Sequence, residues 1–219
     1  MHLSLGIDEA GRGPVLGPLV VACVVANPKD RRWFAALHVR DSKVVPSHER
    51  EDLAARIKER CFYRILIAEP VQIDAAVRDR TRTLNGLERE MMSDLLKEAQ
   101  AAFPDEDMNA YIDTPDINAE RFGDKLHETS GWKDRTTLFA LHRADAKHRT
   151  VGAASLIAKE ERERLMRELR QEIGIDLGCG YPHDERTREF IRTCSQESPH
   201  VRWTWKTARI CEAAKRGVS

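Results

Sequence analysis

Residues 3–25 constrain the fold of this chain more than any other segment. An apolar run, Leu3–Ile7, leads into two adjacent acids, Asp8 and Glu9, and a second apolar run covers residues 19–25. Successive side chains of a strand point to opposite faces, so the two acids diverge where the strand ends. Burial of carboxylates is costly unless a positive charge compensates them, and a divalent cation could compensate both. The segment therefore predicts two antiparallel strands with acids at one end of a sheet.

The turn between these runs has its own chemistry. Gly11 and Gly13 leave room for backbone N–H groups to approach a ligand, and Arg12 adds a fixed cation. A solvated hairpin turn is equally typical of such residues, because turns favour Gly, Pro and Asp for backbone reasons. The residues alone leave both interpretations open.

Composition bounds the classes of function. The 219 residues are enough for one generous domain, and 41% of them are hydrophobic, which allows a substantial core. Lys and Arg (36) balance Asp and Glu (36), so the net charge is zero and gives no global attraction to nucleic acid. Any such binding must come from local basic patches, which favours a cleft enzyme over a coating protein.

The cysteines and the apolar segments bear on the compartment. Five widely spaced cysteines without a CxxC pair suggest neither a disulfide framework nor a zinc site. A reducing, cytoplasmic location is expected. The apolar run at residues 16–26 is interrupted by Gly17 and Pro18 and is too short to span a bilayer. We therefore expect no membrane association.

Hydrophobic periodicity predicts a mixed α/β protein. Strands are expected over residues 3–8, 19–25, 62–68, 110–113 and 137–142. Helices are expected over residues 47–60, 84–102, 118–128 and 151–172, followed by two amphipathic stretches at 185–194 and 204–215.

Two further acids stand at or just beyond predicted strand ends. Asp113 closes one strand, and Asp145 lies just past another. In open α/β sheets the functional crevice forms beyond strand ends, so these acids could converge with Asp8 and Glu9. Two hard cations need several oxygen ligands and suit phosphodiester cleavage. Each acid has an alternative role: Asp113 as a turn acid with Asp116 as its competitor, and Asp145 as a solvated loop acid.

Several motifs together resemble the type 2 ribonucleases H (ribonuclease HII). DEAGRGP at residues 8–14, with Gly17-Pro18 after it, resembles the opening motif of that family. YIDTPDIN at 111–118 resembles its third-acid segment, particularly in archaeal and eukaryotic style. HRADAK at 142–147 with AASLIAK at 153–159 resembles the segment of the fourth acid. The resemblance implies that Asp8, Glu9, Asp113 and Asp145 are the catalytic, metal-binding acids.

The same resemblance implies residues that contact substrate. It assigns the sensing of the 2′-hydroxyl to the turn Gly11-Arg12-Gly13, and GCGYPHD at 178–184 places Tyr181 at the sugar after the ribonucleotide. Asp41-Ser42-Lys43 resembles a DSK element in which Ser42 and Lys43 meet phosphate. On spacing alone, Tyr181 could equally be a turn aromatic. Further candidate phosphate contacts are Arg143, Lys147, Arg149, Arg202, Lys206 and Arg209.

Two segments depart from the family pattern, and one of them is Val44-Val45 after Lys43, where a second basic residue and a leucine are common. After Lys159 the family usually shows an apolar residue and then Arg-Asp, whereas Glu160-Glu161-Arg162-Glu163 stands in this chain. This departure bears on phosphate affinity and substrate preference rather than on the metal acids.

The resemblance also implies the fold, the activity and the metal ions of the protein. The expected fold is a ribonuclease H-like mixed five-stranded sheet flanked by helices, with a catalytic core over residues 1–172 and a C-terminal helical extension over 173–219 in the same compact unit. The expected activity is endonucleolytic cleavage of the RNA strand of RNA–DNA hybrids, and of ribonucleotides embedded in duplex DNA, with two Mg²⁺ or Mn²⁺ ions. We expect a monomer without a partner subunit. The alternatives are a non-catalytic nucleic-acid-binding subunit and another nuclease on this fold, such as a junction resolvase.

Overall fold

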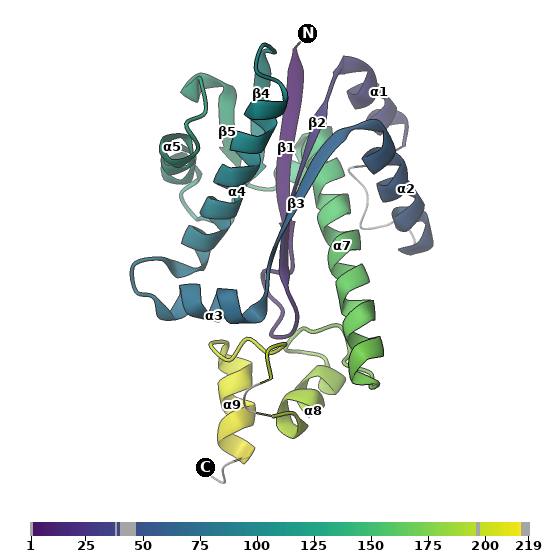
Figure 1. Ribbon diagram of the computed structural model, residues 1–219, viewed down its shortest axis with the longest axis vertical. Coiled ribbons are helices and arrows are strands. Elements are labelled where there is room, and N and C mark those ends of the chain that lie inside the picture. Colours follow the sequence, from purple (N-terminus) through teal and green to yellow (C-terminus); the bar gives the residue numbers. More distant parts are fainter. Residues whose placement is uncertain (1, 38, 40–46, 196–197, 216–219) are drawn as a thin grey trace. The chain divides into compact units, whose positions relative to one another are not determined.

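The computed structural model describes residues 2–37, 39, 47–195 and 198–215 and contains a five-stranded mixed sheet (Figure 1). The strands are β1 (Leu3–Ala10), β2 (Leu19–Ala26), β3 (Phe62–Ala68), β4 (Met108–Asp113) and β5 (Leu138–Leu141). Their order across the sheet is β3-β2-β1-β4-β5. The expected strands are confirmed, each with bounds within two residues of the prediction.

Strand direction follows from the connections. β2 runs antiparallel to β1 across a short turn, whereas β4 and β5 run parallel to their neighbours because helices separate them in the chain. Every residue of β2 is buried, and all but one residue of β1. Strands buried on both faces need a helical cover on both faces, which explains the continuous apolar runs seen in the sequence.

The helices include all those expected and several more. The structure contains α1 (Pro28–Ala36), α2 (Ser47–Arg60), α3 (Pro70–Arg78), α4 (Thr83–Ala102), α5 (Ala119–Ser130), α6 (Ala144–Lys147), α7 (Arg149–Ile173), α8 (Glu185–Thr193) and α9 (Lys206–Lys215), with a 3-10 turn at Arg135–Thr137. Asn118 caps α5 by accepting from the N–H of Arg121, as its position predicted. Among the described residues, no helix is long and apolar enough to cross a bilayer.

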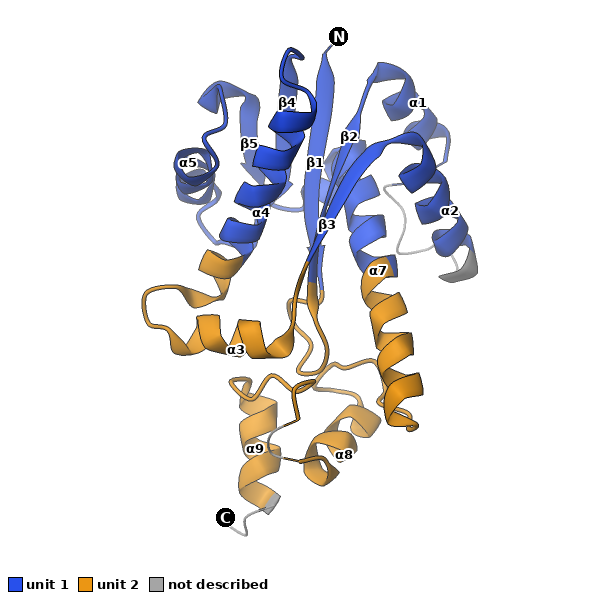
Figure 2. Cartoon of the chain, in the orientation of Figure 1, with its two compact units in different colours: residues 1–10, 20–66, 88–160 blue, residues 11–19, 67–87, 161–219 orange. Residues whose placement is uncertain are grey.

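The chain forms two compact units, coloured separately in Figure 2. Unit 1 comprises residues 1–10, 20–66 and 88–160, and unit 2 comprises residues 11–19, 67–87 and 161–219. We expected a core over 1–172 and an extension over 173–219. Because compact units are not necessarily separate folding domains, that boundary stays a prediction.

Within unit 1, the start of α7 lies directly against the centre of β1. A Cβ atom added to Gly6 would stand 2.3 Å from the backbone of Thr150 and of Val151. Beside this contact, the hydroxyls of Ser4 and Thr150 are 3.0 Å apart and hydrogen-bonded. Glycine at position 6 thus permits a helix-to-strand approach that no other residue would allow.

The core of unit 2 is a separate apolar cluster. Its buried members come from the turn after β1, the end of α7, helices α8 and α9, and the loops before these two helices: Val15, Leu16, Met166, Leu169, Leu177, Phe190, Ile191, Val201, Ala208 and Cys211. The two amphipathic stretches near the C-terminus therefore pack their apolar faces inward, as their pattern predicted.

Candidate active site

The sheet of unit 1 brings three distant acids to one edge. In the parallel register Ile7 pairs with Ile112, so the next positions, Asp8 and Asp113, lie on neighbouring strands at the same height. Asp113 in turn pairs with Leu141 at the end of β5, and α6 with Asp145 follows three residues later. Carboxyl ends of parallel strands share one edge, which is why acids from residues 8, 113 and 145 meet.

The carboxylates of Asp8, Asp113 and Asp145 form a compact group. One oxygen from each lies within 4.8 Å of the others, with Asp8 buried and the other two half-buried. Hard divalent cations bind oxygen at roughly 2.0–2.6 Å, so two ligands of one ion stand at most about 5 Å apart. The donor set, the spacing and the burial therefore fit a divalent metal ion.

Electrostatics point the same way. Burial raises the pKa of Asp8 well above its ordinary value of 3.8; the charges of Glu9 and Asp113 raise it further, and a hydrogen bond from Ser155 opposes this. The pKa of Asp113 is also raised, first by burial and then by the charge of Asp145 against hydrogen bonds from the backbone. Like charges held this close need a cation to be ionised together at neutral pH.

Local hydrogen bonds fix each carboxylate. The N–H of Glu9 donates to Asp8 Oδ1 over 2.8 Å, and the N–H of Ala144 donates to Asp113 Oδ1 over 3.1 Å. Asp145 lies in the first turn of α6, where it accepts from the N–H of Ala146 over 2.8 Å. The loop after β5 is thereby tied to the acid that ends β4.

Helix α7 adds two residues whose roles the sequence did not reveal. Lys159 Nζ donates to Ser155 Oγ over 2.7 Å, and Ser155 is hydrogen-bonded to Asp8. An ammonium group can only donate a hydrogen bond. The Ser155 hydroxyl therefore accepts from Lys159 and donates its own hydrogen bond to the Asp8 carboxylate. The i, i+4 spacing of Ser155 and Lys159 on a helix is the signal that could have found this chain of bonds.

Glu9 and Asp116, the competitor of Asp113, are not among the three converging carboxylates. Glu9 is half-buried and close enough for its charge to raise the pKa of Asp8, but it is not one of the three converging carboxylates. Asp116 is held by two hydrogen bonds from Arg121, over 2.8 and 3.1 Å. Asp116 is therefore a structural acid, which favours Asp113 as the functional one.

The predicted phosphate contacts of unit 1 divide into described and undescribed residues. Arg143 and Lys147 are exposed on either side of Asp145, and Arg143 adopts a left-handed backbone (φ 56°) at the start of α6. Ser42 and Lys43 lie outside the described residues. Contacts of all four with phosphate stay predictions.

In unit 2 the glycine turn and Tyr181 come together. Gly11 has φ +89°, and a Cβ there would stand 2.6 Å from the carbonyl oxygen of Pro18, so only glycine fits without strain. A Cβ on Gly13 would lie 3.4 Å from Cε1 of Tyr181, whose side chain is 37% exposed. Arg12 is fixed by a 2.7 Å hydrogen bond to Asn85. The residues expected to read the sugar are thus neighbours.

One predicted phosphate contact is wrong. Arg202 is fully buried, and its guanidinium donates to backbone carbonyls of residues 11, 12 and 17. Burial lowers the pKa of Arg202 to about 9, with a second contribution from the charge of Arg162. Lys206 and Arg209 are exposed, so their contact with phosphate stays a prediction.

The departure from the family pattern has a structural explanation in unit 1. Glu160, standing where an apolar residue is usual, is buried and forms a 3.0 Å ion pair with Arg50. A buried carboxylate is tolerated when a cation compensates it. The charge of Glu160 is therefore compensated by Arg50 on α2.

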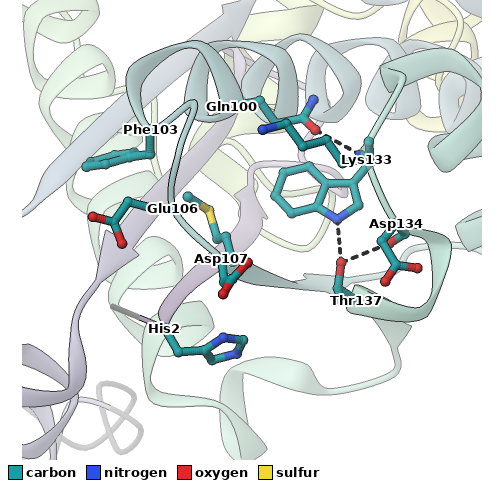
Figure 3. A pocket seen from close by; sticks show the side chains of 10 residues that line it. His2, Gln100, Phe103, Glu106, Asp107, Lys133, Asp134 and Thr137 are labelled. Carbon is teal, nitrogen blue, oxygen red and sulfur yellow. Dashed lines mark hydrogen bonds between the residues drawn. The ribbon is translucent and has the colours of Figure 1, made fainter.

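Unit 1 contains a cavity of about 280 Å³ at the amino ends of the parallel strands. Figure 3 shows the side chains that line it. It is lined by His2, Gln100, Phe103, Glu106, Asp107, Met108, Trp132, Lys133, Asp134 and Thr137. Several of its polar groups bond to each other, such as the Trp132 indole to Thr137 (2.9 Å) and Gln100 to the N–H of Lys133 (3.0 Å). The candidate site lies at the opposite ends of these strands, where open sheets carry their chemistry.

The fold and its acids place the chain among nucleases of the ribonuclease H-like class. Relatives and solved structures define it further. The ribonuclease HII of Pyrobaculum arsenaticum is 41% identical over 211 residues, which cover 94% of this chain and 97% of that protein. The crystal structure of ribonuclease H2 from Pyrococcus horikoshii OT3 superposes with a TM-score of 0.84 at 35% identity, covering 98% of this chain and 99% of that one.

A further solved structure is the PCNA complex of RNase HII from Archaeoglobus fulgidus, with a TM-score of 0.76 and 38% identity over 86% of this chain and 85% of that one. The family model of ribonuclease HII matches residues 5–208. The chain belongs to the ribonuclease HII family. It is therefore a ribonuclease H, an enzyme and not a non-catalytic binding subunit. Membership of this family supports activity on RNA–DNA hybrids.

Proposed function

We propose that this ribonuclease H is a divalent-metal-dependent endonuclease that cleaves both RNA–DNA hybrids and duplex DNA with embedded ribonucleotides. The observation that carries the proposal is the convergence of Asp8, Asp113 and Asp145 within 4.8 Å at one sheet edge. Membership of the ribonuclease HII family supports the substrate class.

The acids have a stated task in this proposal. Asp8, Asp113 and Asp145 hold Mg²⁺ or Mn²⁺, and Glu9 completes a two-ion site. Bound at this position, a pair of divalent ions supplies an activated water and neutralises charge on the leaving oxygen. The fit rests on an all-carboxylate donor set, which hard cations prefer, and on the raised pKa of Asp8, which a cation would lower again.

Other residues orient the acids and the substrate. Ser155, itself hydrogen-bonded to Lys159, orients the carboxylate of Asp8 by donating a hydrogen bond to it. Gly11, Arg12 and Gly13 read the 2′-hydroxyl, and Tyr181 packs against the sugar that follows the ribonucleotide. Cleavage on the 5′ side of the ribonucleotide leaves a 3′-hydroxyl and a 5′-phosphate.

A chimera assay tests the proposal. The substrate is duplex DNA with one ribonucleotide, incubated with Mg²⁺, with Mn²⁺ and with chelator, beside a long RNA–DNA hybrid. We expect a single incision 5′ of the ribonucleotide with either ion and none with chelator. Cleavage that persists in chelator would contradict the metal requirement.

The same assay separates this enzyme from other nucleases of the fold. An all-DNA four-way junction is the matched control substrate, since a junction resolvase needs no 2′-hydroxyl. We expect the junction to remain intact. Incision of the junction with the chimera left uncut would contradict the proposed substrate class.

A further inference from the structure

We propose that Arg202 is a positioning residue for substrate specificity: with Trp205 it holds the Gly11–Gly13 turn in the orientation that distinguishes a ribonucleotide from a deoxyribonucleotide. The inference rests on the proposed function of that turn. It concerns residues of unit 2 alone, and Arg202 itself touches no substrate in it.

The contacts form a complete set around one guanidinium. Nη2 of Arg202 donates to the carbonyl of Gly11 over 2.7 Å and to that of Gly17 over 2.8 Å, Nε donates to Gly17 over 3.0 Å, and Nη1 donates to Arg12 over 3.1 Å. The indole Nε1 of Trp205 donates to the carbonyl of Gly13 over 3.2 Å. Three consecutive carbonyls of the turn are therefore fixed by two side chains.

These bonds also set the direction of the donors on the turn. In a trans peptide the C=O and the following N–H point to opposite sides. Because the carbonyls of Gly11 and Arg12 point to Arg202, the N–H groups of Arg12 and Gly13 point away from it. Gly13 in turn lies beside the ring of Tyr181. The conformation of the turn therefore sets both the directions of these N–H donors and their place beside the Tyr181 ring.

Arginine is the side chain that this task requires. Its planar fork carries five N–H donors, whereas a lysine ammonium is a single point with three. Cζ of the guanidinium lies over the Trp205 ring, 5.1 Å from the ring centroid, and this cation–π contact helps to hold the group in place. Arg202 remains positively charged at neutral pH, because its lowered pKa of about 9 still lies above it.

The charge of this cluster is unusual for a purely structural clamp. Among the described residues neither Arg202 nor its neighbour Arg162, which is 8% exposed, forms an ion pair, although the charges of Asp74 and Glu69 partly offset the lowering of the Arg202 pKa. Burial of unpaired charge costs several kcal/mol in general, so packing alone does not explain it. A cationic centre beneath a turn that meets nucleic acid explains it, since the ligand is a polyanion.

The test is a binding preference measured in chelator, where no cleavage occurs. Affinities of wild type and Arg202→Lys are compared for two duplexes that differ only by one 2′-hydroxyl. Arg202→Lys keeps the charge but not the fork. We expect its preference for the ribonucleotide duplex to fall about tenfold, the equivalent of one well-placed hydrogen bond, while affinity for all-DNA stays within about twofold. Arg192→Lys, on the exposed face of α8, is the matched control and should keep the wild-type preference.

A second variant guards against a folding defect. Trp205→Phe removes the bond to Gly13 and keeps an aromatic ring over Arg202, and we expect an intermediate loss of preference. Thermal unfolding checks that each variant is folded. If folded Arg202→Lys and Trp205→Phe both keep the wild-type preference and cleavage, the inference is overturned. If wild type itself shows no ribonucleotide preference and no cleavage, the proposed function is what fails, and the inference falls with it.

Discussion

The two units hold side chains of opposite charge: carboxylates that accept from backbone N–H groups in unit 1, and guanidinium groups that donate to backbone carbonyls in unit 2. In unit 1, Asp8 lies near the end of β1, Asp113 ends β4 and Asp145 lies in the first turn of α6, and backbone N–H groups donate to all three. In unit 2, Arg162 and Arg202 are buried among loops, and both donate to backbone carbonyls.

The difference separates two ways of building a functional surface. Parallel strands bring acids to one edge as a by-product of topology, so the acids can be few and far apart in sequence. Irregular loops have no such register, and an arginine must hold each carbonyl individually. The acids prepare a place for cations, whereas the arginines stiffen the backbone. Three predictions test this contrast.

The largest effect is expected from the acids. Asp8→Asn should lower the cleavage rate by about 10³-fold or more, because an amide is a poor ligand for a hard cation and the reaction depends on the whole constellation. Single-turnover cleavage of the one-ribonucleotide duplex measures it. Binding of the hybrid and the fold should be retained.

The matched control for this variant is Asp116→Asn. Asp116 pairs with Arg121 and lies outside the converging group, so its amide variant should cleave at close to the wild-type rate. An active Asp8→Asn enzyme, or an inactive Asp116→Asn enzyme, would remove the proposed ligand set.

The next effect is on stability and compares the two buried arginines. Arg202→Met should lower the free energy of unfolding by about 3 kcal/mol, because three buried carbonyls each lose a donor. Arg162→Met should be close to neutral or stabilising, since Arg162 makes one long bond of 3.3 Å and its Nε has no hydrogen-bond partner among the described residues. Urea denaturation measures both.

An exposed arginine provides the reference for that comparison. Arg164 forms ion pairs with Glu161 and Glu168 on the surface of α7, and Arg164→Met should change stability by less than about 1 kcal/mol. Equal losses from Arg164→Met and Arg202→Met would mean that burial and carbonyl bonding do not set the difference.

The smallest effect is the pH dependence of the metal-free protein. The pKa values of Asp8 and Asp113 are raised in the folded state, so above the ordinary value of 3.8 the folded state binds more protons than the unfolded state. The free energy of unfolding should therefore fall as the pH rises through the raised pKa values. In chelator, Asp8→Asn should flatten this slope and stabilise the protein by about 1–2 kcal/mol at pH 8. A steeper slope, or a less stable variant, would contradict the electrostatic account.

Strand pattern and motif order predicted most of unit 1. The third strand was expected over 62–68 and observed as Phe62–Ala68, because a short run rich in aromatic and β-branched residues marks it directly. Asp113 and Asp145 could be placed together because strand ends of a parallel sheet share an edge. These features follow from local sequence and one rule of topology.

Short helices and buried arginines escaped prediction for different reasons. Helices α1 and α3 have nine residues each, too few for a clear apolar stripe, although Pro28 and Pro70 at their first turns were available signals. Arg202 gave no local signal at all. Its partners lie 185–191 positions away in a loop, and a charged residue in an amphipathic stretch is normally solvated.

Gly6 carries no functional group, yet through its contact with the backbone of Thr150 it controls the chemistry of the candidate site. Thr150 lies in the first turn of α7, the helix that carries Ser155, and it comes five residues after Asp145. Even a methyl group at position 6 would wedge the helix off the strand and pull two of the site's members away from Asp8. Because Gly6 has no side chain, α7 lies close to β1, and this distance sets the spacing of the acidic residues.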